Sequence, residues 1–249
     1  MSASLKLISL NIERSKHLGT VLSFLEKQQP DVVCLQEVVE NDVTRFAAVL
    51  GGADYVFAPA LRHMEMQGNP IVGEAIFSRL RVVQKGIQFY AGNADDVPEH
   101  RPSKETEEGH IMNCALVTLV AEKEGDLFTI GTTHFTWSPG GAATLEQRIN
   151  IKKLVSTLKM YQEIVFTGDF NAPRGGEIFS ILADAYTDNV PAEYTTSLDG
   201  TLHRAGQLHL MVDGLFSTPE YAVSHVEMVC GLSDHCAIMG EISRSGERN

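Results

Sequence analysis

Apolar runs and helix-like segments alternate along the amino-terminal part of the chain. Residues 5–12 (LKLISLNI) predict a strand, and residues 31–39 (DVVCLQEVV) predict a strand buried on both faces, because apolar side chains follow one another without alternation. Between them, residues 17–29 carry apolar side chains at helical spacing. The pattern therefore predicts a strand, a helix and a second strand, followed by a short helix over residues 41–50.

Strand patterns dominate the middle of the chain. They cover residues 55–60, 73–79, 82–90, 110–120 and 127–135. A charged turn separates the last two, which predicts an antiparallel hairpin, and a tight connection joins 73–79 to 82–90. The polar segments 62–69 and 91–109 predict loops. A loop as long as the second is often functional, and a solvated insertion is the alternative.

The clearest helix pattern spans residues 142–160. Its apolar side is formed by Leu145, Ile149, Leu154, Val155 and Leu158.

The helix leads into residues 163–171, EIVFTGDFN, which predict another strand buried on both faces. Because strand side chains alternate, Asp169 and Asn171 should point to one side and Phe170 to the other. A polar turn ahead of Pro173 is the alternative interpretation of these residues.

The last third of the chain repeats this rhythm. A helix is predicted over 176–185, an irregular polar segment over 187–209, and strands over 210–217, 222–229 and 236–242. The whole order of elements predicts an α/β fold of four layers, in which helices flank two packed, mainly antiparallel or mixed sheets. No linker divides the chain, so we expect a single domain over residues 1–249, with about 244–249 as a disordered tail.

The net charge of −12 argues against a protein that grips long duplex nucleic acid, since no basic stripe accompanies it. It agrees with a cleft that gathers carboxylates around a divalent ion. The four cysteines lie in or beside apolar runs without a CxxC spacing, so we expect buried, reduced thiols. Neither a signal peptide nor a membrane-spanning run is recognisable, and a cytoplasmic protein without a membrane anchor is expected.

Polar residues stand at or near the ends of the predicted strands, where open sheets place their ligand sites. They are Asn11, Glu37, His134, Asp169, Asn171, Asp213, Asp234 and His235. An acid at the end of a core strand indicates a metal ligand, which is our interpretation of Glu37. The alternative is that Glu37 begins the next helix, where a carboxylate suits the helix dipole.

Six short motifs resemble, in order, those of the endonuclease/exonuclease/phosphatase superfamily, which includes pancreatic-type DNases, abasic-site endonucleases, sphingomyelinases and inositol polyphosphate 5-phosphatases. They are LNI at 10–12, LQE at 35–37, TTH at 132–134, GDFN at 168–171, VDGLF at 212–216 and SDH at 233–235. Together they span nearly the whole chain. The resemblance implies a metal-dependent phosphoric ester hydrolase, most plainly a nuclease or repair-type phosphodiesterase that uses water as the nucleophile.

The resemblance also implies a role for each residue. Glu37, with Asn11 beside it and Asp234, would hold Mg²⁺, for which Mn²⁺ could substitute. The catalytic set would be Asp169, Asn171, His134, Asp213 and His235. Asp169 would orient or deprotonate water, Asn171 would hold the phosphate or that water, and His134 would protonate the leaving group. His235 would contact a phosphate oxygen while Asp213 fixes its ring. Glu74 is a candidate partner of His134.

The substrate is left open by the sequence. Arg62, Trp137 and Arg204 are candidate substrate-binding residues, and packing under a loop is the alternative for Trp137. His63, Arg101, Lys104 and His203 are interpreted as solvated charges. The expected partner is a phosphoester, either DNA or RNA, or alternatively a small or lipid phosphoester. A catalytically silent binding module is a further alternative, and we expect a monomer.

Overall fold

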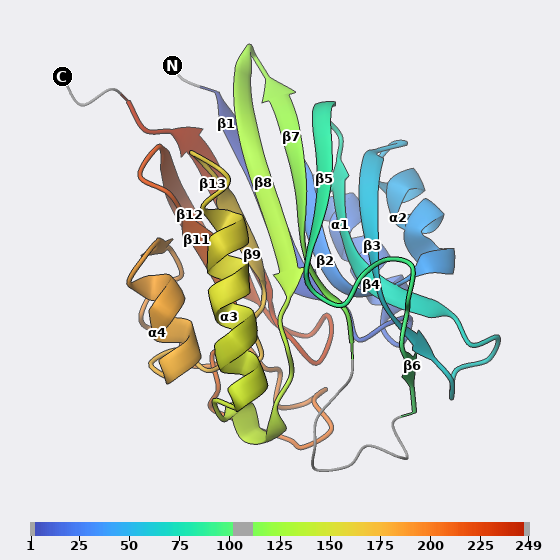
Figure 1. The fold of residues 1–249 in the computed structure, drawn as a ribbon. Coiled ribbons are helices and arrows are strands. Elements are labelled where there is room, and N and C mark those ends of the chain that lie inside the picture. The colour runs from blue at the N-terminus through green and yellow to red at the C-terminus, as the bar shows by residue number, and fades with distance from the viewer. Residues whose placement is uncertain (1–2, 102–111, 247–249) are drawn as a thin grey trace.

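The computed structural model describes residues 3–101 and 112–246, which form four layers (Figure 1). Two sheets pack face to face. Helices α1 (Leu18–Gln28) and α2 (Val43–Val49) cover the outer face of one sheet, and α3 (Leu145–Leu158) and α4 (Glu177–Ala183) cover the outer face of the other. This arrangement confirms the predicted four-layer sandwich of mixed sheets.

Within the described residues, the first sheet has seven strands and the second has six. In spatial order the first contains β12 (Tyr221–Val229), β13 (Ala237–Arg244), β1 (Ser4–Asn11), β2 (Val32–Val39), β4 (Ile71–Ser78), β3 (Asp54–His63) and β6 (Glu99–His100). The second contains β10 (Thr187–Asp188), β11 (Asp213–Ser217), β9 (Val165–Asp169), β8 (Asp126–His134), β7 (Cys114–Lys123) and β5 (Arg81–Ala91).

A parallel strand–helix–strand unit lies in each sheet. β1 and β2 pair in parallel across α1, and β8 and β9 pair in parallel across α3. The carboxyl ends of parallel strands meet at one edge of a sheet. Asn11, His134 and Asp169 end three of these strands, so the two units bring them to the same end of the sandwich.

The central core lies between the sheets and receives alternate side chains of both. Two outer cores fix the helices. The one under α3 and α4 contains a cluster of rings, in which Phe166 stacks on Phe216 with ring centroids 5.2 Å apart. Burying each such ring stabilises the fold by roughly 1.5–3 kcal/mol. β9 is therefore held on both faces, as its unbroken apolar run predicts.

The sheet membership of β4 and β5 was not predictable from their pattern. They follow each other closely, but β4 belongs to the first sheet and β5 to the second. The short link at Arg79 and Leu80 carries the chain from one sheet to the other. β3 also runs further than predicted, because it pairs with β4 as far as Arg62 and with β6 through His63.

The buried side of α3 agrees with the prediction at Leu154 and Leu158 but differs from it nearer the start of the helix. Leu145 and Ile149 are 72% and 47% exposed, whereas Gln147 and Asn150 are buried. Both amides bind the segment after β8: Gln147 donates to the Thr136 carbonyl at 2.8 Å and Asn150 to its hydroxyl at 2.9 Å. Backbone groups of that segment need buried donors, and this requirement outweighs the apolar pattern of the helix.

The prediction of four reduced cysteines is wrong for two of them. Cys230 and Cys236 form a disulfide, with Cα atoms 4.2 Å apart. Cys34 and Cys114 are free and buried, as expected. The bond brackets the segment that carries Asp234 and His235, so it bears on the geometry of the candidate site.

The carboxyl-terminal strand reaches into the predicted tail. β13 ends at Arg244, whose guanidinium binds both carboxylate oxygens of Glu163. Residues 247–249 lie outside the described residues, and so do residues 102–109 of the predicted 91–109 loop. In the part of the chain that the structure describes, no helix is long and apolar enough to cross a membrane.

Candidate active site

The end of β9 presents the first acid of the site. Asp169 is buried and Asn171 follows it in the left-handed region, at φ 48°. The Asn171 amide N–H donates to Asp169 Oδ1 at 2.8 Å, which closes the turn. Both residues line the cavity described below, while Phe170 packs in the outer core. The predicted sides of these three residues are confirmed, although β9 ends at Asp169 and Asn171 belongs to the turn that follows it.

Gly168 allows β9 to lie close to β8. A Cβ atom at this position would stand 1.9 Å from the carbonyl oxygen of Thr133, and the backbone has φ 150°. Only glycine fits there. The close approach sets His134 and Asp169 opposite each other in the parallel ladder.

A bulge in β2 turns Glu37 into the site. β2 pairs with β4 at Leu35 opposite Ala75 and resumes at Val38 opposite Gly73, so Gln36 and Glu37 together face Glu74. Glu37 has φ 57°. The extra residue returns Val38 to the helix-covered core that holds Leu35, and it frees the Glu37 carboxylate to line the cavity.

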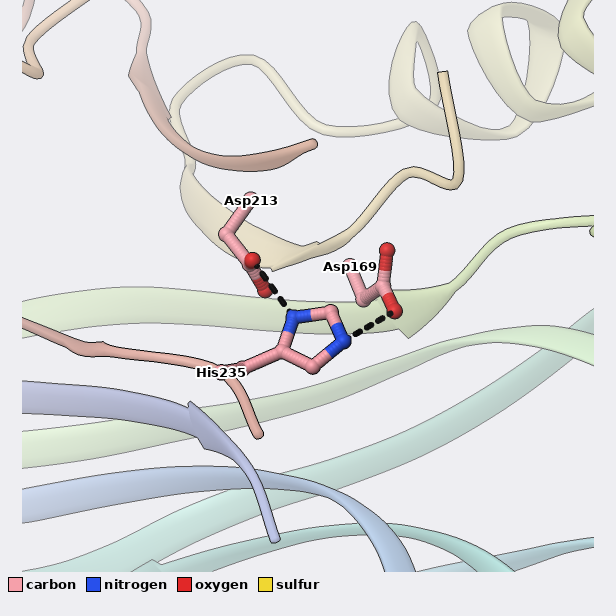
Figure 2. Close-up of side chains that lie close together, drawn as sticks. All are labelled: Asp169, Asp213 and His235. Atoms are coloured by element: carbon pink, nitrogen blue, oxygen red, sulfur yellow. Dashed lines mark hydrogen bonds and ion pairs between the residues drawn. The ribbon is translucent and has the colours of Figure 1, made fainter. Parts of the chain in front are cut away.

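His235 lies between two carboxylates, as Figure 2 shows. Its Nδ1 is 2.7 Å from Asp213 Oδ2, and its Nε2 is 3.7 Å from Asp169 Oδ2. Asp213 and Asp169 are directly opposite in the antiparallel pair of β11 and β9. The predicted grouping of these three residues is therefore present in the structure.

The charges of this group keep the ring protonated. Burial lowers the pKa of His235, but the charges of Asp213 and Asp169 outweigh it and raise the pKa well above its ordinary value. Burial would raise the pKa of Asp169, yet the neighbouring histidines hold it far below its usual range. The pKa of Asp213 is raised by burial against the opposing charge of His235.

His134 is placed between Asp169 and Glu74. Its Nε2 is 3.4 Å from Asp169 Oδ2 and its Nδ1 is 3.9 Å from Glu74 Oε1. Burial lowers its pKa, but the hydrogen bond and charge of Asp169 with those of two glutamates raise it to about 9. Glu74 is 1% exposed, and burial raises its pKa to about 8. The expected partnership of Glu74 and His134 agrees with this placement.

Asn11 acts on the site as a donor. Its Nδ2 donates to Asp169 Oδ2 at 3.1 Å and to Glu37 Oε1 at 3.3 Å. Its Oδ1 accepts from the amide of Glu13 at 3.1 Å. The oxygen that would serve as a metal ligand is thus engaged in the turn after β1, and the side chain ties two carboxylates together.

Most of these residues line one cavity of about 370 Å³, whereas Asn11 and Asp213 are not among its described lining residues. Its walls come from the ends of the strands, from the segment after β8 and from the irregular segment before β11. Among the described residues it is lined by Glu13, Arg14, Glu37, Ala60, Leu61, His63, Val72, Glu74, His100, Met112, His134, Trp137, Ser138, Gly140, Gly141, Asp169, Asn171, Leu198, His203, Arg204, Ala205, Leu208, Leu210, Val212, Asp234 and His235.

Two of the three predicted substrate-binding residues belong to the cavity wall that the structure describes. Trp137 and Arg204 line the cavity. Arg62 is not among the lining residues that the structure describes, and its guanidinium donates to the Asn69 carbonyl at 3.1 Å. Its role in substrate binding remains a prediction. His63, interpreted from the sequence as a solvated charge, is instead buried against the cavity, because β3 extends to include it.

The donor set fits a hard divalent cation. Glu37 Oε2 is buried and, among the described residues, accepts no hydrogen bond. Asp234 lines the same cavity, and its pKa is raised by burial and by the charges of Glu37 and Glu13, against the opposing charge of His235. Carboxylates that repel each other around an unsatisfied oxygen suit Mg²⁺ or Mn²⁺. Asp169, Asp213 and His235 also come within 4.8 Å of one another, but the close Nδ1 contact commits His235 to Asp213.

The sequence-based prediction did not include Arg14 or its neighbour Glu13, which lie in the turn after β1. Arg14 lines the cavity, and its NH1 is 3.1 Å from Glu37 Oε2. The signal was present in the position of Glu13 and Arg14, immediately after the LNI motif at the end of β1. Without the bulge at Glu37, however, nothing in the sequence places these side chains together.

Comparison with known proteins agrees with the geometry. A sequence model of the endonuclease/exonuclease/phosphatase family matches residues 8–235. No curated protein matches the sequence. Among solved structures, an endonuclease/exonuclease/phosphatase from Bacteroides vulgatus is similar at a TM-score of 0.73 and 17% identity, covering 98% of this chain and 100% of that chain.

Two further solved structures have the same fold. The human Nocturnin catalytic domain with bound sulfate anion gives a TM-score of 0.71 at 18% identity, covering 98% of this chain and 97% of that chain. A mannosyl-6-phosphatase from Bacteroides thetaiotaomicron gives a TM-score of 0.68 at 15% identity, covering 96% and 99%. At these identities the likeness concerns the fold.

Proposed function

Because this chain belongs to the endonuclease/exonuclease/phosphatase family, we propose that it is a divalent-metal-dependent phosphoesterase that hydrolyses phosphodiester bonds by attack of water. The observation that carries the proposal is the convergence on one atom, Asp169 Oδ2. Asn11 donates to this oxygen at 3.1 Å, and the Nε2 atoms of His134 and His235 lie 3.4 and 3.7 Å from it.

Asp169 is the residue proposed to position water. Its lowered pKa keeps it ionised, so it accepts a hydrogen bond from water and directs the lone pair toward phosphorus. The same lowered pKa makes Asp169 a weak base, so its carboxylate is better suited to orienting the water than to taking up its proton. Asn171 holds this carboxylate through its own amide N–H and so supports it in that role.

The two histidines are proposed as donors to the phosphoester. His235, held by Asp213, donates to a non-bridging oxygen as negative charge builds there. His134, with a pKa of about 9, carries a proton at neutral pH that it can give to the leaving oxygen. Mg²⁺ or Mn²⁺ held by Glu37 and Asp234 would neutralise phosphate charge and stabilise the leaving oxygen.

A small phosphoester is the second candidate substrate, and the shape of the cavity favours it. The candidate residues line a cavity of about 370 Å³, which is within the usual size of a small-ligand pocket. The net charge of −12 also disfavours long polyanions. A terminal phosphodiester of a nucleic acid or a small phosphate ester would enter more readily than the middle of a duplex.

An assay panel tests the proposal. Purified protein is given bis-p-nitrophenyl phosphate, p-nitrophenyl phosphate, a single-stranded oligonucleotide and nicked duplex DNA, each with Mg²⁺ and with EDTA. We expect hydrolysis of at least one diester with Mg²⁺, and a much lower turnover after Asp169→Asn. Inactivity on the whole panel, or activity that Asp169→Asn leaves unchanged, would refute the proposal and favour a binding module.

A further inference from the structure

Arg14 is held over the cavity by a strained turn. Glu13 has φ 48° and Arg14 has φ 61°, so two successive side-chain-bearing residues occupy the left-handed region. Such strain persists only where surrounding contacts enforce it, and it concentrates at functional sites. Here the Asn11 side chain binds the Glu13 amide, and Lys16 and His17 bind the Glu13 carboxylate at 2.8 and 3.1 Å.

The turn leaves the guanidinium poorly matched to its neighbour. Arg14 NH1 is 3.1 Å from Glu37 Oε2, yet that oxygen accepts no hydrogen bond from any described residue. The other carboxylate near Arg14 is Glu13, at 3.8 Å from NH2. A well-seated arginine–carboxylate pair has two parallel hydrogen bonds. The contact is therefore one of charge without the directed bonds that guanidinium can make.

The carboxylate that Arg14 contacts is also the first candidate metal ligand. A guanidinium and a divalent cation carry charge of the same sign, so they compete for Glu37 Oε2. A phosphate held by a cation at Glu37 would lie beside Arg14, and its oxygens match the planar donor set of guanidinium better than one carboxylate oxygen does.

We propose that Arg14 binds the phosphate of the substrate, an inference that rests on the proposed function. When a divalent cation binds Glu37, the Arg14 guanidinium leaves that carboxylate and contacts the phosphate instead. Before exchange the guanidinium compensates the buried carboxylate. After exchange it contacts the phosphate from the turn that follows β1. Cation and phosphate binding are consequently coupled through one arginine, and each strengthens the other.

Binding measurements separate this inference from the proposed activity. Calorimetric titration with Mg²⁺ is carried out with and without saturating inorganic phosphate, on the wild-type protein and on Arg14→Gln. In phosphate-free buffer Arg14→Gln should bind Mg²⁺ more tightly, because a competing cation is gone. Phosphate should increase the Mg²⁺ affinity of the wild-type protein. The factor of that increase should be at least about fivefold smaller in Arg14→Gln.

Arg45→Gln is the matched control. It removes an exposed guanidinium that pairs with Asp42 at 3.1 Å and that is not among the described residues lining the cavity. It should leave Mg²⁺ affinity and its coupling to phosphate at wild-type values, and Arg14→Lys should keep part of the coupling because it keeps the charge. Circular dichroism and melting temperature establish that each variant is folded.

The outcomes are distinguishable. Equal Mg²⁺ affinity and equal coupling in Arg14→Gln and the wild-type protein would overturn the inference while leaving the proposed activity intact. Weaker Mg²⁺ binding in Arg14→Gln would overturn it too, since Arg14 would then support the metal ligands instead of competing for them. If the wild-type protein bound no Mg²⁺, or bound it unaffected by Glu37→Gln, the proposed function would fail first.

Discussion

The Nδ1 atom of His235 lies 2.7 Å from Oδ2 of Asp213, within hydrogen-bond distance and away from solvent. The contact joins the segment before β13 in one sheet to the first residue of β11 in the other. It commits one ring nitrogen to the acid and leaves Nε2 facing the cavity side, toward Asp169. One hydrogen bond therefore fixes both the orientation of the ring and the site of its free proton.

We expect His235→Ala and Asp213→Ala to be non-additive. Loss of one donor to a developing phosphate charge typically lowers turnover by roughly a hundred- to a thousand-fold. The double variant should cost little more than His235→Ala alone, because Asp213 acts through the ring it orients. Turnover of a diester at saturating Mg²⁺ measures this. Losses that multiply fully would show that the two residues act separately.

Asp169→Asn should lower turnover while substrate affinity stays the same or rises. The amide keeps the shape and one acceptor oxygen, but it removes the negative charge that orients water and the charge that holds both histidines protonated. Separate determination of kcat and KM tests this. A raised KM with unchanged kcat would instead assign Asp169 to ground-state binding.

Activity should be lost in EDTA and restored by Mg²⁺ or Mn²⁺, and Glu37→Gln should weaken binding of the added cation. The melting temperature of Glu37→Gln without metal should stay near the wild-type value or fall slightly. Burial would raise the pKa of Glu37, but the charges of Arg14 and His134 lower it, so the substitution gives up these contacts while it relieves the repulsion on Asp234. Glu40→Gln, an exposed change in the next turn, is the control. A large fall in melting temperature for Glu37→Gln would mark Glu37 as a structural residue.

The stability of the metal-free protein should fall as pH rises. The pKa of Glu74 is raised from 4.5 to about 8 and that of His134 from 6.5 to about 9, so the folded state binds more protons than the unfolded state across these windows. Each group lowers the free energy of unfolding by at most about 1.4 kcal/mol per pH unit inside its window.

Glu74→Gln isolates one of these contributions. Urea unfolding in EDTA should give a shallower fall in stability between pH 5 and 8 for this variant than for the wild-type protein, because Glu74 no longer has to ionise in a buried place. The His134 contribution above pH 6.5 should remain. Identical slopes for the two proteins would mean that Glu74 does not hold a proton in the folded state.

Reduction of the Cys230–Cys236 bond should destabilise the protein and lower turnover. The bond closes a loop with a sequence separation of 6, for which the chain-entropy account gives roughly 2 kcal/mol. Asp234 and His235 lie inside that loop, so their positions should loosen. Melting temperature and turnover with and without dithiothreitol measure the effect, and Cys230→Ser should already have the reduced values. A Cys230→Ser protein with wild-type stability and turnover would contradict the expectation.

The order of the elements and most of the site could be predicted from local pattern. The apolar run before Gly168 predicts β9 because unbroken apolarity requires burial on both faces, and the period of two places Asp169 and Asn171 together. The two β–α–β rhythms, ending at Glu37 and Asp169, carry the polar residues to one edge. These features depend on side-chain periodicity and on the direction of parallel strands, both of which are properties of the chain itself.

Only the tertiary structure decided the contacts that require two distant segments. The bulge at Glu37 exists because Val38 must return to the same core as Leu35, and this brings Arg14 against the carboxylate. The buried side of α3 was set by backbone carbonyls that Gln147 had to satisfy, against its apolar pattern. The pairing of Cys230 with Cys236 depended on the hairpin-like approach of two strand ends. In each case the deciding contact depends on how separate elements meet in space, which side-chain periodicity does not encode.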